Sequence, residues 1–244
     1  MLTVGVVGGW VYPVDKGSGS ITTLALADGF IDIPDRVEHL DRGEEVQVQL
    51  FGNAPEAALL VEGEDCPRLE SIASALSFDM RVVSTGSRRG AISAEDGVAD
   101  IAVVSRSIGQ EPVWDEMALE PVGGYRRELV MMARDPEILD LAGAEDRKVV
   151  GWSRDSEMSR ILRRVLEESG SEKAKLVGAA RTHAAVAAAV KAGRADLGFG
   201  VREVAEEAGL ALRKVAEDEI LFLVRPDKRD RGAVRAFLEA LKWE

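Results

Sequence analysis

The stretch AGRADLGFG at 192–200 repeats the pattern of an earlier one, DGVADIAVV at 96–104. In both, glycine, a variable residue, alanine and aspartate precede an apolar run, and both follow a helix-like segment, at 87–96 and 183–192. Glycine just past a helix can adopt the left-handed conformation that ends it, and the apolar run predicts a short buried strand. Two such helix–turn–strand motifs favour two similar half-domains over a chance repeat of common residues.

Strand and helix patterns alternate from about residue 56 to the end of the chain. Strands are expected at 56–63, 81–86, 100–105, 127–136, 148–152, 174–179, 196–200, 210–215 and 219–226, and helices at 66–76, 87–96, 156–170, 183–192, 201–209 and 230–243. Such alternation is typical of a mostly parallel sheet covered by helices. The expected fold class is α/β, with two lobes.

The first fifty residues show β-strand and turn patterns without the alternating helices of the rest of the chain. The segments 4–14 and 44–52 are β-like, and turn signals lie between them. Glycine, asparagine and proline then cluster at 51–57. We expect a small β-domain at 1–53 and a larger α/β domain at 54–244.

Charge and cysteine content limit the function classes. The net charge is −12, which argues against nucleic acid and anionic membranes as partners. Cys66 is the single cysteine, so no intrachain disulfide forms. The first residues lack a signal-peptide pattern, and no apolar run approaches a membrane span. These features predict a cytoplasmic protein.

Polar residues follow three of the predicted strands. Gly86 and Ser87 start one helix, Ser105 ends a strand, and Thr182 and His183 start another helix. Ligands of open α/β sheets bind at the carboxyl ends of strands, where helix N-termini attract anions. Ser and Thr are also the ordinary N-cap residues, and His183 could be a plain capping or exposed histidine. Three such positions together favour a ligand cleft.

No catalytic or metal-binding pattern stands out. The chain has no nucleophile elbow, no HExxH and no Walker-type phosphate loop. Arg160 lies in the first turns of its helix, where a cation opposes the helix dipole. It is therefore the candidate cation for an anionic ligand, or the partner of a nearby carboxylate.

Residues 8–51 resemble the C-terminal β-domain of the molybdopterin molybdotransferase family, the MoeA and gephyrin type. The segments KGSGSITTLALADGF (16–30) and GEEVQVQL (43–50) carry the likeness. The resemblance implies that the turn at Gly17 and Ser18 approaches substrate across a dimer. It also implies a molybdopterin-binding domain or a second copy of the chain as partner, because that family's large central domain is absent here.

Residues 54–244 resemble a periplasmic-binding-protein-like domain of type II, found fused to molybdenum-related proteins and to DNA-binding regulators. The segments VVSTGSRRGAISAEDGVADIAVVS (82–105) and THAAVAAAVKAGRADLGFGVREVAEEAGL (182–210) carry this likeness. It implies two lobes joined by crossing strands, with a small-molecule ligand between them. By this likeness lobe 1 spans about 54–126 and 218–244, and lobe 2 about 127–217.

Two positions depart from that family's pattern. A Gly-Ser-His-Asp pattern is replaced here by Gly63, Glu64, Asp65 and Cys66, and a Gly-Ser-Gly-Thr-Arg pattern by the residues 156–160, with Glu157 at the second position. The added carboxylates would repel a bare oxyanion in a dry cleft. Glu64 and Asp65 are therefore expected in the site as groups that select against molybdate or tungstate and leave room for a larger ligand.

Together these observations predict a non-catalytic binding module for a small anion or a pterin-type compound, linked to molybdenum or tungsten cofactor biosynthesis. The candidate ligands are molybdate, tungstate and a molybdopterin-type compound, and no cofactor is required. Two alternatives remain open. The chain could be the C-terminal accessory part of a molybdotransferase, an enzyme only with the missing domain, or a partner-docking module with a vestigial cleft.

The composition also predicts high thermal stability. The chain holds one Asn and three Gln, while charged residues make up 30%, as in proteins of thermophiles. Scanning calorimetry should give an unfolding midpoint above the mesophilic range of about 45–65 °C. A midpoint inside that range would contradict a thermophilic source.

Overall fold

The computed structural model describes residues 1–14, 27–33, 40–41, 43–52, 57–108, 114–141, 146–154 and 156–241. The chain divides into two compact units. Unit 1 comprises Met1–Leu60 with Ser77–Arg81, and unit 2 comprises Val61–Leu76 with Val82–Glu244. Among the described residues, no helix combines the length and the apolar character needed to cross a membrane.

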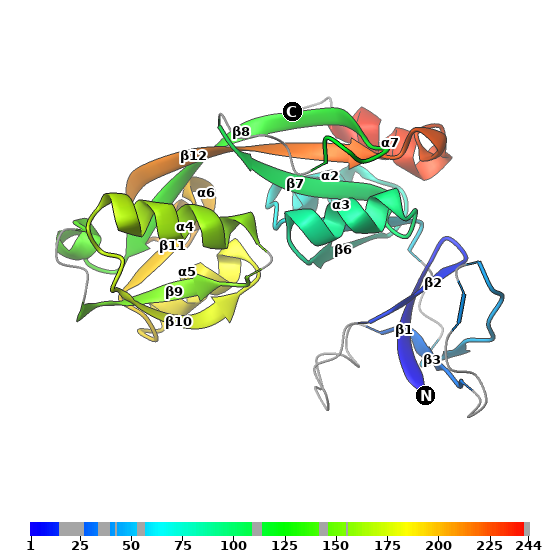
Figure 1. The fold of residues 1–244 in the computed structure, drawn as a ribbon, viewed down its shortest axis with the longest axis horizontal. Coiled ribbons are helices and arrows are strands. Elements are labelled where there is room, and N and C mark those ends of the chain that lie inside the picture. Colours follow the sequence, from blue (N-terminus) through cyan, green and yellow to red (C-terminus); the bar gives the residue numbers. More distant parts are fainter. Residues whose placement is uncertain are drawn as a thin grey trace. The chain divides into compact units, whose positions relative to one another are not determined.

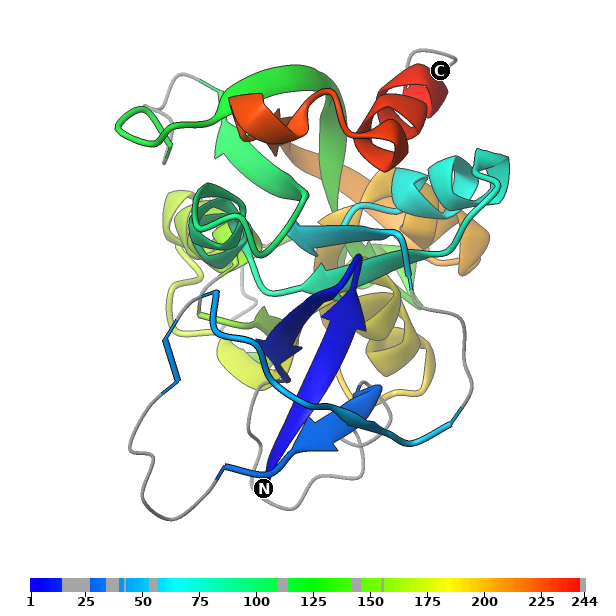
Figure 2. The same ribbon diagram turned by 90° about the vertical axis from the view of Figure 1, so that its right-hand side faces the viewer.

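Unit 1 contains a four-stranded antiparallel sheet in the order β2-β1-β3-β4, drawn in blue in Figure 2. Its strands are β1 (Leu2–Val7), β2 (Trp10–Pro13), β3 (Gly29–Ile31) and β4 (Gln49–Leu50). The small β-domain predicted from the sequence is thus present. The strand expected at 44–52 is shorter than its alternating pattern indicates, because among the described residues Gln49 and Leu50 are those that pair with β3.

Asp28 ties the strands of unit 1 to its second segment. Its carboxylate accepts a hydrogen bond from the Val6 amide at 2.7 Å and is held at both oxygens by the Arg81 guanidinium. Arg81 also donates to the Tyr12 hydroxyl, at 3.2 Å. Burial is the largest single influence and opposes ionisation of Asp28. The hydrogen bonds from Arg81 and Val6 and the Arg81 charge together outweigh burial and lower the pKa of Asp28.

The larger sheet is mixed, with the order β10-β9-β11-β8-β12-β7-β5-β6, and most of its residues belong to unit 2. The strands are β5 (Leu59–Gly63), β6 (Met80–Ser84), β7 (Ile101–Ser107), β8 (Glu120–Ala133), β9 (Lys148–Trp152), β10 (Lys175–Ala180), β11 (Leu197–Val201) and β12 (Ala211–Val224). In Figure 1, β8 and β12 run between two groups of strands and helices. This is the two-lobed α/β fold that the sequence predicts.

Helices accompany each group of strands. They are α2 (Arg68–Ala75), α3 (Ser87–Glu95), α4 (Glu157–Glu168), α5 (His183–Lys191), α6 (Arg202–Glu207) and α7 (Gly232–Leu241), with 3-10 turns η1 (Pro136–Leu139) and η3 (Pro226–Lys228). We call the group that comprises β5, β6, β7, α2, α3 and α7 lobe 1. We call the group that comprises β9, β10, β11, α4, α5 and α6 lobe 2.

The two crossing strands are longer than expected. β8 and β12 have 14 residues each and pair antiparallel along their length. At one end β12 also pairs with β7 of lobe 1, and at the other end β8 pairs with β11 of lobe 2. The prediction of two separate strands at 210–215 and 219–226 was wrong, because β12 is one strand over this region. The register shift between Lys214 and Ala216 absorbs the break in pattern, so one strand continues.

The repeated motif occupies equivalent places in the two lobes, as predicted. Gly97 after α3 and Gly193 after α5 have φ values of 71° and 72°. The amides of Gly97 and Val98 bond back to the end of α3, and those of Gly193 and Arg194 do the same for α5. Each motif then leads into a strand, β7 or β11, that pairs with a crossing strand.

Lobe 2 has a continuous apolar core beneath this motif. Met131 and Met132 of β8, Leu162 of α4, Val190 of α5 and Phe199 of β11 are all fully buried or nearly so. The indole N–H of Trp152 donates to the Phe199 carbonyl at 3.0 Å. These side chains set the positions of the N-termini of α4 and α5, which matter below.

The two motif glycines provide a test of the fold. At Gly97 or Gly193 an alanine must adopt the left-handed conformation and also meets an arginine, Arg225 or Arg134 respectively. We expect Gly97→Ala and Gly193→Ala each to lower the free energy of unfolding by about 1–2 kcal/mol. Chemical denaturation measures this. Gly232→Ala is the control, since an added Cβ there meets nothing within 4 Å, and equal losses at all three positions would contradict the argument.

Candidate ligand-binding site

The site is organised around the turn that follows β5. Gly63 ends that strand, and a Cβ there would lie 1.9 Å from the Val103 carbonyl oxygen, so only glycine fits. The Gly63 carbonyl accepts the amides of Thr85 and Gly86, both at 2.9 Å. The Glu64 amide donates to the Val103 carbonyl at 2.8 Å. These contacts hold the residue that follows Gly63 at the face of lobe 1 toward lobe 2.

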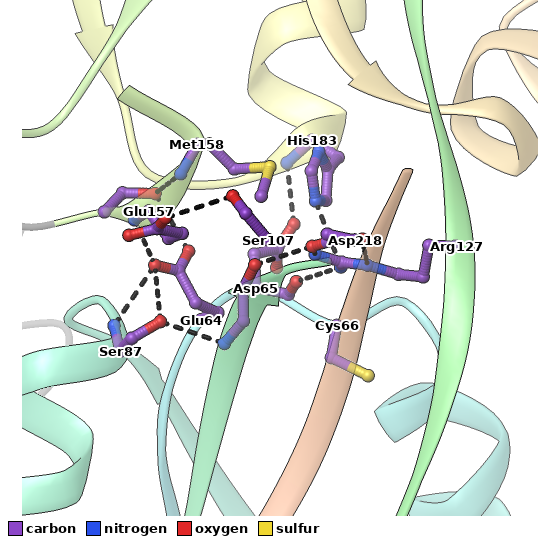
Figure 3. A network of polar contacts seen from close by, with 12 residues as sticks. Glu64, Asp65, Cys66, Ser87, Ser107, Arg127, Glu157, Met158, His183 and Asp218 are labelled. Atoms are coloured by element: carbon purple, nitrogen blue, oxygen red, sulfur yellow. Dashed lines mark hydrogen bonds and ion pairs between the residues drawn. The ribbon is translucent and has the colours of Figure 1, made fainter. Parts of the chain in front are cut away.

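The Glu64 carboxylate lies between the lobes and is bound by donors from both. Its Oε1 accepts the Ser87 amide and hydroxyl, each at 3.1 Å, and the Glu157 amide at 2.5 Å. Its Oε2 accepts the Ser156 hydroxyl at 2.8 Å. The side chains lie together in Figure 3. Ser87 begins α3 and Ser156 caps α4, so two helix N-termini favour this negative charge.

Asp65 makes a second connection between the lobes. Its Oδ2 accepts the backbone amide of His183 at 2.6 Å, and His183 is the first residue of α5. Burial raises the pKa of Asp65, although the hydrogen bond from His183 opposes this effect. Glu64 and Asp65, adjacent in lobe 1, therefore reach the N-termini of α4 and α5 in lobe 2.

An ion pair between the crossing strands lies beside this turn. Arg127 of β8 faces Asp218 of β12 in the strand register. Its Nε donates to Asp218 Oδ1 at 3.0 Å and its Nη2 to Oδ2 at 2.6 Å, and the side chains are 1% and 0% exposed. Nη1 donates to the Asp65 carbonyl at 3.0 Å, and Ser105 donates to Asp218 at 2.6 Å. Burial disfavours the charge on Arg127, but Asp218 outweighs burial and raises the Arg127 pKa.

His183 is fully buried next to the ion pair. Its Nε2 lies 3.4 Å from Arg127 Nη1, and its ring packs edge-on against Trp152 with centroids 4.8 Å apart. Its Nδ1 has no hydrogen-bond partner among the described residues. Burial, and then the charge of Arg127, hold the pKa of His183 well below its usual value. The imidazole is therefore neutral at physiological pH.

Glu157 brings a further buried carboxyl group to the network. Its Oε1 accepts the Ser107 hydroxyl at 3.4 Å, and its Oε2 accepts Arg160 Nη1 at 2.9 Å. Burial raises the pKa of Glu157 and the nearby charge of Glu64 adds to the rise, whereas Arg160 opposes it. Two carboxyl groups and one mostly exposed arginine thus meet at the start of α4.

The structure brings most of the predicted site residues together. Glu64, Asp65, Ser87, Ser105 and His183 belong to one connected set of hydrogen bonds. In this set the Ser105 amide donates to the Ser87 hydroxyl at 2.9 Å. Gly86 is the buried N-cap of α3.

Three other predicted positions contribute differently. Thr182 caps α5 by accepting the Ala185 amide at 3.2 Å. The Arg160 side chain is 61% exposed and meets the network through Glu157. Gly17 and Ser18 lie outside the described residues.

Sequence reasoning missed the central cation and its partner. Arg127 and Asp218 stand in charged stretches, RREL and EDEI, that look like the solvated ends of strands. The signal in the sequence that could have identified this pair was the opposite charge of two residues in the strands that cross between the lobes. Ser107 and Ser156 were missed as site residues for a similar reason, since serines at strand and helix ends are common.

A groove of about 490 Å³ adjoins the network. One face of α4, with Ile161, Arg164 and Val165, forms one wall, and residues 214–217 of β12 form the other. Ser107 lines the groove and also donates to Glu157. The groove in unit 2 therefore reaches the edge of the buried hydrogen-bond network, at Ser107.

No group of three or more His, Cys, Asp or Glu side chains among the described residues could hold a metal ion. The Cys66 thiol lies 3.2 Å from the Tyr125 hydroxyl, and burial raises the pKa of Cys66. A buried thiol of raised pKa is a poor nucleophile. The N-termini of α3 and α4 already hold a negatively charged group, the Glu64 carboxylate.

Two lobes on a shared sheet, joined by two crossing strands and meeting at helix N-termini, define the class of periplasmic-binding-protein-like domains. The family model for the PBP superfamily domain matches residues 71–242, so the chain belongs to this family. The model for the MoeA C-terminal region (domain IV) matches residues 2–51. Both resemblances seen in the sequence are thereby confirmed. No curated protein matches the sequence.

Solved structures share the fold at low sequence identity. The regulatory domain of CcmR from Synechocystis in complex with 2-PG has a TM-score of 0.56 at 13% identity, covering 76% of this chain and 96% of that one. The effector-binding domain of QuiR in complex with shikimate has a TM-score of 0.55 at 13% identity, covering 76% and 95%. OxyR from Corynebacterium glutamicum has a TM-score of 0.51 at 15% identity, covering 75% of this chain and 66% of OxyR.

The buried ion pair yields a stability prediction. Asp218→Ala leaves the buried Arg127 charge without its partner, so the free energy of unfolding should fall by about 3–5 kcal/mol. Denaturant titration measures the loss. Glu120→Ala, which breaks an exposed pair with Arg229, is the matched control and should cost under about 1 kcal/mol. Similar losses for both variants would refute the central role of the buried pair.

Proposed function

We propose that the chain is a non-catalytic module that binds a small anionic or pterin-type ligand between its two lobes and acts in molybdenum or tungsten cofactor biosynthesis. One observation carries the binding part. Four donors from two helix N-termini, on Ser87, Ser156 and Glu157, converge on a single carboxylate between the lobes. Donors arranged in this way form an anion site.

The link to the cofactor rests on the first residues of the chain. The match of 2–51 to the MoeA C-terminal region supports work alongside a molybdopterin-binding domain, on another chain or in a second copy of this one. The two relatives crystallised with shikimate and with 2-PG support a small molecule as ligand of the larger domain. Arg160, next to the site through Glu157, is the cation that we assign to the ligand.

A second function is favoured by the same carboxylate. Because Glu64 fills the donor set, the cleft could be vestigial, and the module would then dock a partner without binding a small molecule. The two functions differ in one measurable respect. A working site must accept an external anion once Glu64 is removed.

Isothermal titration calorimetry with molybdate, tungstate, sulfate and a pterin phosphate tests the proposal. Glu64→Ser removes the competing charge and restores a small hydroxyl, so it should bind at least one of these anions at least about tenfold more tightly than the wild type, a difference of about 1.4 kcal/mol. Arg160→Ala in that background should weaken binding again, by about one to two decades. Glu62→Ser on the same strand is the control.

Two outcomes would contradict parts of this account. Tight binding of molybdate by the wild type would refute the argument that Glu64 and Asp65 select against simple oxyanions. If neither the wild type nor Glu64→Ser binds any of the four compounds, the docking function replaces the ligand-binding one.

A further inference from the structure

The contacts of residues 64 and 65 span the gap between the lobes. Glu64 belongs to the turn after β5 in lobe 1, yet two of its four hydrogen bonds come from Ser156 and Glu157 of lobe 2. Asp65 adds the bond to the His183 amide. All of these groups are buried or half-buried.

We propose that Glu64 is a tethered ligand of the cleft, which with Asp65 locks the two lobes together without any small molecule. The proposal rests on the proposed function in one respect, since it places the Glu64 carboxylate at the site where the external anion would bind. It adds the regulation of that site. An incoming ligand must displace the Glu64 carboxylate. Binding of the ligand and loss of the contacts that Glu64 makes with lobe 2 are therefore one event.

The geometry of the carboxylate supports this role. Ser87 holds Oε1 from lobe 1, while the Glu157 amide holds the same oxygen from lobe 2. The group therefore bridges the lobes as a bound anion would. Because it is attached to lobe 1, its effective concentration at the lobe 2 donors is far above that of a free ligand. Closure then costs no loss of translational freedom by a second molecule.

Asp65 strengthens the lock at a different helix. The two adjacent carboxylates reach α4 and α5, so lobe 2 is held at two points and cannot pivot about one. The Arg127 guanidinium holds the Asp65 carbonyl at 3.0 Å and so fixes the backbone from which both side chains extend. Replacement of either carboxylate should loosen the lobes. Glu64 should matter more, because it accepts two hydrogen bonds from lobe 2 and Asp65 accepts one.

The distance between the lobes is the direct measurement. In the full chain, Ile92→Cys on α3 and Lys173→Cys in lobe 2 provide exposed sites for spin labels, and Cys66 is buried at 4% exposure. Double electron–electron resonance without ligand should give a short, narrow distance distribution for this pair. Adding Glu64→Ala should shift the distribution to longer distances and broaden it, and Glu62→Ala should leave it unchanged.

Chemical rescue separates a lost ligand from a damaged fold. Formate supplies a carboxylate small enough for the space left by Glu64→Ala, and saturating formate should restore the short distance. Glu64→Gln keeps the size of the side chain and loses its charge, so it should open partly. Circular dichroism confirms that each variant is folded.

Three results would overturn the lock. These are an open distribution in the wild type, identical distributions for the wild type and both Glu64 variants, or an opening that formate does not reverse. The proposed function fails separately: if Glu64→Ala opens and formate closes it, but Glu64→Ser binds none of the four anions by calorimetry, the lock stands and the small-molecule function falls.

Discussion

The buried pair of Arg127 and Asp218 is the interaction on which the arrangement of the lobes depends. It joins the two crossing strands at the point where they pass between lobes, and its members are almost inaccessible to water. A buried ion pair is stable only when further hydrogen bonds satisfy both groups. Here the Asp65 carbonyl and the Ser105 hydroxyl supply them. One guanidinium thereby determines where the turn carrying Glu64 lies.

The placement of Glu64 follows from the demands of helix N-termini. The first amides of α3 and α4 have no partners within their own helices, and buried donors without acceptors are costly. A ligand can satisfy them, or the chain can. Here Glu64 supplies a charged acceptor from within the chain. Closure and satisfied donors are then compatible in the absence of any other molecule.

The sequence predicted the architecture better than the site. The repeated motif and the alternation of strands and helices were sufficient to predict two lobes, because glycine past a helix and apolar runs are local signals. The length of β12 was missed, since its bulge hides the continuity of the strand. Glu64 was expected only as a group that repels anions, whereas its carboxylate accepts hydrogen bonds from Ser87, Ser156 and Glu157. Residue type alone does not reveal whether a carboxylate points at donors or away from them, and Arg127 could not be separated from solvated charges.

The order of strands in the large sheet also bears on how the chain folds as it is synthesised. Lobe 2 is continuous in sequence apart from its share of the crossing strands, so its local contacts can form once the start of β12 has emerged. Lobe 1 cannot be completed until the end of β12 pairs with β7 and α7 follows. Contacts that join distant segments form late and slowly. The strands β5, β6 and β7 therefore keep an unpaired edge at β7 until the last part of the chain is synthesised. Premature termination after α6 would leave lobe 2 nearly complete and lobe 1 without its last strand and helix.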